Sequence, residues 1–69
     1  MTLQQLKYVI EVVSAGSISR AAERLFVTQP SLSNAIRELE QELGVELFLR
    51  TSRGVALTQD GAEFLGYAR

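Results

Sequence analysis

The sequence contains no cysteine and no histidine, and these two absences exclude much chemistry. Without cysteine, the chain has neither a disulfide framework nor a thiolate metal ligand, which is typical of a reducing compartment. Without histidine, it lacks the commonest metal ligand and the commonest general base. We therefore expect no metal, no cofactor and no enzymatic activity.

Long apolar runs and a basic leader are also missing. No apolar stretch approaches the roughly 20 residues of a membrane-spanning helix, and the first residues lack the basic and apolar regions of a signal peptide. We expect a cytoplasmic protein with no membrane association. At 69 residues, the chain is long enough for one domain with a small core of marginal stability.

An excess of positive charge, the usual mark of a nucleic-acid-binding protein, is absent as well. The net charge is −1 and the pI is about 5.3. The charges are nevertheless segregated, because segments 24–37 and 47–59 contain arginines and no acidic residue. The segment between them has no base, and we interpret its acidic residues as solvated. These residues are Glu38, Glu40, Glu42 and Glu46.

Apolar residues recur with the period of an α-helix in three successive segments. Together with Ser or Thr before each segment, this spacing predicts helices over about 3–14, 18–25 and 29–43. The pair Ala21 and Ala22 allows another helix to cross closely over the second helix.

Two apolar stripes on the first helix predict that it is mostly buried. The main stripe contains Leu3, Leu6, Ile10 and Val13, and it is widened by Val9 and Val12.

Apolar residues at alternate positions follow the third helix and predict a short β-hairpin. They are Val45, Leu47 and Leu49, followed by Val55 and Leu57. The segment 50–54 (RTSRG) lies between the two runs, and we expect the turn near Gly54. Thr58 is a candidate cap for a fourth helix that still continues at Arg69.

The second and third predicted helices, joined by a short turn, describe a helix-turn-helix, whose second helix can enter a DNA major groove by its N-terminal end. Small polar residues gather at that end. They are Thr28, Gln29, Ser31, Ser33 and Asn34. Gln and Asn can pair with adenine, and Ser can donate or accept at any base edge, with roughly 1 to 3 kcal/mol of discrimination per good contact. Alternatively, these side chains are only helix caps and a hydrated face.

The basic segment 50–54 follows the candidate reading helix, where a wing would lie. A wing arginine can enter the narrow minor groove, and Thr and Ser can donate to phosphates.

The whole chain resembles the N-terminal winged helix-turn-helix of the LysR-type transcriptional regulators. The resemblance rests on the motifs AAERL, TQPSLS, LGVELF and LTQDG in this order and without a gap. It implies a mainly α fold with a three-helix core, a two-stranded hairpin wing and the start of a linker helix. The domain would span residues 1–58 and the linker helix would begin within 59–69.

The resemblance also implies sequence-specific binding of double-stranded DNA by a bacterial transcription factor, with helix 29–43 in the major groove and wing 50–54 at the minor groove and backbone. The implied groove contacts are Gln29, Pro30, Ser31, Ser33, Asn34, Arg37 and, from the wing, Arg53. The implied phosphate contacts are Thr28, Arg50 and Thr51. Two positions depart from the family's commoner pattern. Asn34 favours adenine over an arginine-to-guanine contact, and Leu49 would present an apolar side chain to solvent or to a neighbouring molecule.

The resemblance further implies a homodimer formed through the linker helix, and a small-molecule effector that binds a C-terminal domain not included in this sequence. We expect weak dimerisation of this truncated chain. On pseudo-palindromic DNA, two copies would lie about 34 to 36 Å apart. The main rival is a protein-docking module, which the net negative charge would suit, and an enzyme is the weakest alternative.

Overall fold

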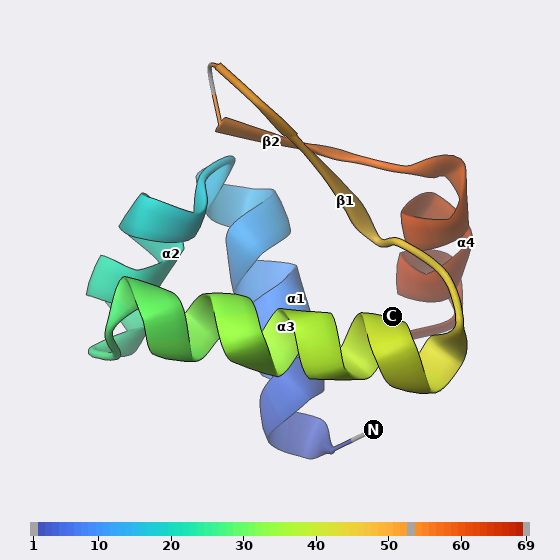
Figure 1. Cartoon of the computed structure of the whole chain (residues 1–69), viewed down its shortest axis with the longest axis horizontal. Coiled ribbons are helices and arrows are strands. Elements are labelled where there is room, and N and C mark those ends of the chain that lie inside the picture. The colour runs from blue at the N-terminus through green and yellow to red at the C-terminus, as the bar shows by residue number, and fades with distance from the viewer. Residues whose placement is uncertain (1, 53, 69) are drawn as a thin grey trace.

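The described part of the chain folds into four helices and one antiparallel hairpin (Figure 1). The computed structural model describes residues 2–52 and 54–68. The elements are α1 (Leu3–Ala15), α2 (Ile18–Leu25), α3 (Gln29–Leu43), β1 (Phe48–Thr51), β2 (Gly54–Leu57) and α4 (Gln59–Ala68). The predicted mainly helical fold is confirmed. Among these helices, none is both long enough and apolar enough to span a bilayer.

Local hydrogen bonds explain where the first two helices begin. The Thr2 hydroxyl accepts from Gln5 N at 3.0 Å, and Gln5 Oε1 accepts in return from Thr2 N, which completes a capping box. The Ser17 hydroxyl accepts from the backbone of the second helix, at Arg20 N. Each cap satisfies an amide that has no acceptor within its own helix.

The core lies where α1, α2 and α3 cross. Ala21 and Ala22 are buried there against Val12, Leu32 and Ile36. Small side chains on α2 let the other two helices approach closely. The predicted role of the alanine pair is therefore confirmed.

The prediction that α1 is mostly buried is wrong. Val9 and Val12 are fully buried, whereas Leu3 is 69% exposed and Ile10 is 38% exposed. The neighbouring elements cover one side of α1, and its N-terminal end extends beyond α3 (Figure 1). The row with Leu3 and Ile10 and the row with Val9 and Val12 both have helical spacing. Tertiary packing buries the row with Val9 and Val12 and leaves the other row partly exposed.

The hairpin pairs Phe48 with Leu57 and Thr51 with Gly54. The first strand begins at Phe48, whereas the alternating pattern predicted a strand from Val45. Leu47 lies before the strand and is buried in the core. Arg50 also belongs to the paired part of β1 and not to the turn. Leu49 is 53% exposed, as its position in the sequence predicted.

The fourth helix begins at a close contact with the chain before the hairpin. Thr58 Oγ1 accepts from Gly61 N at 2.8 Å, which confirms the predicted cap. Leu47 O accepts from Thr58 N at 3.0 Å. Gly61 is buried, and a Cβ there would collide with Leu47 O and lie 2.9 Å from Leu57 Cδ1. Only glycine fits this approach of α4 to Leu47.

Replacing Gly61 by alanine should lower the free energy of unfolding by about 1 to 3 kcal/mol, because the added methyl group overpacks the contact with Leu47 O. Gly66 is the matched control on the same helix, since a Cβ there meets nothing within 4 Å. Gly66→Ala should leave stability unchanged or raise it by up to about 1 kcal/mol. Urea denaturation followed by circular dichroism measures both, and equal stability of the two variants would contradict the account.

Candidate nucleic-acid interface

A short turn joins α2 to α3 and sets the angle between them. Phe26 ends α2 in the left-handed conformation, with φ 58°, and Val27 N donates to Ala22 O at 3.1 Å. Thr28 Oγ1 then accepts from Ser31 N at 3.3 Å and caps α3. Pro30 occupies the first turn of α3, where its missing N–H costs no helical hydrogen bond. This is the predicted helix-turn-helix.

The residues predicted from α3 share one accessible face of that helix. Those that are exposed are Thr28, Gln29, Pro30, Ser31, Asn34 and Arg37, and Ser33 is half-buried. The opposite face carries Leu32, Ile36 and Leu39, which are buried. The Thr28 hydroxyl also donates to Ser31 Oγ at 2.8 Å, so the cap and the first serine are linked. Short side chains here leave the helix end open to a close approach.

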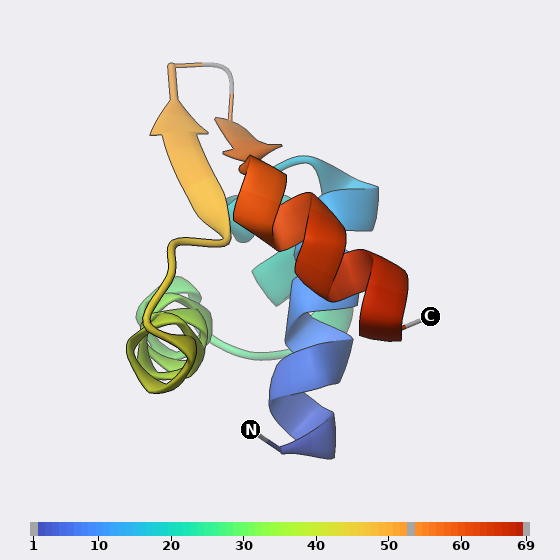
Figure 2. The same cartoon turned by 90° about the vertical axis from the view of Figure 1, so that its right-hand side faces the viewer.

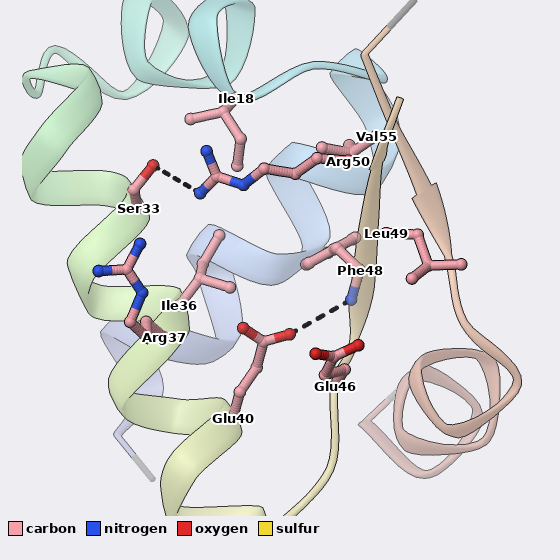
Figure 3. Close-up of a pocket in the computed structure, with 10 residues that line it drawn as sticks. All are labelled: Ile18, Ser33, Ile36, Arg37, Glu40, Glu46, Phe48, Leu49, Arg50 and Val55. Carbon is pink, nitrogen blue, oxygen red and sulfur yellow. Dashed lines mark hydrogen bonds between the residues drawn. The ribbon is translucent and has the colours of Figure 1, made fainter. Parts of the chain in front are cut away.

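The wing, defined here as β1, β2 and the turn between them, lies beside the same helix. Viewed from the side, α3 and β1 lie on one side of the molecule and α4 on the other (Figure 2). Arg50 Nη2 donates to Ser33 Oγ at 3.1 Å and connects the wing to α3 (Figure 3). Thr51 Oγ1 donates to Gly54 O at 3.3 Å. Arg53 lies outside the described residues.

The far end of the wing is attached to the turn between α1 and α2. Val55 N donates to Gly16 O at 3.2 Å. Gly54 has φ +136°, and a Cβ there would collide with Gly16 O. Glycine is required by both the backbone conformation and this contact. The wing is therefore held against the helical core rather than extending freely.

The near end of the wing is attached to α3 by Glu40. Its Oε2 accepts from Leu47 N at 2.7 Å and from Phe48 N at 3.4 Å (Figure 3 shows the second bond). The interpretation of Glu40 as a solvated glutamate is wrong, because the side chain is half-buried and holds two backbone donors. The other three glutamates of this segment are exposed.

A cavity of about 260 Å³ opens between α3 and β1. Its lining includes Ser33, Arg37, Glu40 and Arg50 (Figure 3). Within the described residues, neither arginine forms an ion pair with a carboxylate; the ion pair described is Arg24 with Glu11. The cavity between helix and wing therefore has two guanidinium groups in its lining, together with the carboxylates of Glu40 and Glu46. No group of side chains in residues 2–52 and 54–68 could hold a metal ion.

Comparison with protein families identifies this arrangement. The model of the bacterial regulatory helix-turn-helix proteins of the lysR family matches residues 3–62, and the chain belongs to this family. The HTH-type transcriptional regulator ClcR of Pseudomonas putida is 51% identical over 69 residues, and TfdT of Cupriavidus pinatubonensis is 46% identical. Both matches cover the whole chain, which spans 24% of ClcR and 30% of TfdT.

Solved structures of similar proteins include complexes with DNA. The chain matches the CbnR DNA-binding domain in complex with DNA with a TM-score of 0.95 and 46% identity, covering 100% of this chain and 79% of that one. It matches the BenM domain bound to benA site 1 DNA with a TM-score of 0.92 and 44% identity, covering 99% and 79%. The predictions of a winged helix-turn-helix and of a LysR-type DNA-binding domain are confirmed, and the curated relatives are transcriptional regulators rather than enzymes.

Replacing Glu40 by alanine should lower the free energy of unfolding by about 1 to 3 kcal/mol, because the Leu47 and Phe48 amides lose their acceptor. Hydrogen exchange of the Leu47 amide should accelerate as well. Glu38→Ala removes the same charge from an exposed position of the same helix and should change stability by less than about 0.5 kcal/mol. If both variants lowered the free energy of unfolding equally, the loss would come from the removed charge and not from the hydrogen bonds of Glu40.

Proposed function

We propose that the chain binds double-stranded DNA sequence-specifically by inserting the N-terminal turns of α3 into the major groove while the wing lies on the adjacent backbone and minor groove. The observation that carries this proposal is the shared surface of α3 and wing, joined by Arg50 and Ser33. Two similar domains have been solved with DNA, which supports the same use of the surface here.

Each exposed side chain of α3 suits one kind of contact. Gln29 and Asn34 carry the amides that pair with adenine, and Arg37 carries a guanidinium for an acceptor edge. Ser31 and Ser33 supply hydroxyls, and Pro30 offers apolar contact on the same face. These groups are the proposed base readers.

A second group of residues would position the domain on the DNA backbone. We assign phosphate contacts to Thr28, Arg50 and Thr51, and minor-groove contact to Arg53. Contacts of this kind fix orientation without reading sequence, while an arginine in a narrow minor groove favours A/T-rich flanks.

In the longer protein, residues 1–58 would be the DNA-binding unit and 59–69 the start of a linker helix that forms a homodimer. The length that the relatives have beyond this region would hold a domain that senses a small molecule. Two domains would then occupy pseudo-palindromic half-sites about 34 to 36 Å apart on promoter DNA. Because promoter DNA of a bacterium lies in the cytoplasm, we propose that the protein is located there.

Selection of bound duplexes from a random pool at two salt concentrations tests the proposed function. One sequence should be enriched, and log K for it should fall with log salt by about 0.9 per phosphate neutralised. A pool without enrichment, or an affinity that salt leaves unchanged, would favour protein docking instead.

Gln29→Ala should relax discrimination at one base pair of the selected site by about 1 to 3 kcal/mol while leaving the fold intact. Gln41→Ala is the matched control, because Gln41 is exposed on the same helix near its other end. It should leave both affinity and base preference unchanged. Fluorescence anisotropy with single-base variants of the duplex measures the effect, and equal losses on every duplex would exclude direct readout by Gln29.

A further inference from the structure

The hydrogen bond between Arg50 and Ser33 has a defined direction. A guanidinium has only donors, whereas a serine hydroxyl has one donor hydrogen and two acceptor lone pairs. Arg50 Nη2 therefore donates and Ser33 Oγ accepts, across 3.1 Å (Figure 3). The Ser33 hydrogen stays available for another partner.

Both ends of this bond are held in place by the fold. Arg50 lies in the paired part of β1 opposite Val55, whose amide is bonded to Gly16 O. Ser33 is half-buried on α3 next to the fully buried Leu32. The backbone positions of both residues are therefore set before any ligand binds, although the Arg50 side chain is exposed. This placement reduces the entropy cost of using Ser33 as a contact.

The bond also changes what Ser33 can recognise. One lone pair of its oxygen is occupied, and a positive charge lies beside it, so an approaching N–H donor is disfavoured. Arg37 lines the same cavity and adds a second guanidinium, which has only donors, and the carboxylates of Glu40 and Glu46 also line this cavity. In the major groove, adenine and thymine each present one acceptor, and cytosine presents a donor. Guanine alone presents two acceptors, N7 and O6, and no donor, so it alone can accept from both the Ser33 hydroxyl and a neighbouring guanidinium.

We propose that Arg50 is a positioning residue that fixes Ser33 as a hydrogen-bond donor, and that through this pair the domain selects guanine at one base pair. The proposal rests on the proposed function and deepens it, since serine alone could donate to or accept from any base edge. It assigns Arg50 a role in specificity in addition to its phosphate contact.

A double-mutant cycle tests this role with Ser33→Ala, Arg50→Ala and the double variant. Affinities are measured by fluorescence anisotropy for the selected duplex and for its three single-base-pair variants at each position. At one base pair, Ser33→Ala should reduce the preference for guanine by roughly 5- to 150-fold. Arg50→Ala should reduce the same preference, and the double variant should lose no more than the Ser33 variant.

Two further variants separate positioning from charge and from general damage. Arg50→Lys keeps the positive charge but replaces the planar fork by a flexible ammonium, so the salt slope should stay unchanged while the guanine preference falls. Asn34→Ala combined with Arg50→Ala is the matched control cycle, because no bond joins these residues, and its effects should add. Circular dichroism checks that each variant is folded.

Several results would overturn the proposal. Arg50→Ala could weaken all duplexes by one factor and leave the guanine preference intact, which would make Arg50 a phosphate contact only. The base pair that depends on Ser33 could prefer cytosine, or no base pair could depend on Ser33. If the unmodified domain enriched no sequence at all, the proposed function itself would fail, and this inference would fall with it.

Discussion

Leu47 is held from three directions, and the position of the wing depends on it. Its N–H donates to Glu40 on α3 at 2.7 Å, its carbonyl accepts from Thr58 N at 3.0 Å, and its side chain is fully buried beside Leu39 and Leu65. A single residue thus joins α3, the wing and α4. A buried donor without an acceptor costs about 1 to 3 kcal/mol. Any other placement of Leu47 would leave its N–H without the Glu40 acceptor, so Glu40 favours this one placement of the chain.

The attachment at Gly16 fixes the opposite end of the wing, so that helix and wing present one surface. The bond from Val55 N to Gly16 O lies at the far end, and the bonds to Glu40 lie at the near end. Between them, Arg50 is placed within reach of Ser33. A 69-residue domain has a small core, so these few polar contacts have a large share in holding α3 and the wing, the two elements of the proposed DNA-binding surface, in register.

Local signals in the sequence predicted the helices, because a cap and an apolar period act within a few residues. Ser17 and Thr28 cap as expected. The buried face of α1 could not be predicted in the same way, since two periodic stripes compete and only packing chooses between them. Nor could Glu40 be distinguished from the neighbouring glutamates, because its amide partners come from a later segment. The bond between Arg50 and Ser33 spans 17 residues and exists only in the folded chain.

For α3 and the wing to bind DNA as one unit, their shared surface must be set before DNA binds. An NMR titration of the labelled domain with its selected duplex tests this most directly, by following every backbone amide. The amides of the first two turns of α3 and of the strand ends beside the wing turn should shift most, while the Leu47 amide keeps its resonance and its protection from exchange. If the largest shifts fell on α4 or on the N-terminal end of α1, or if the Leu47 amide lost its protection, the account would be contradicted.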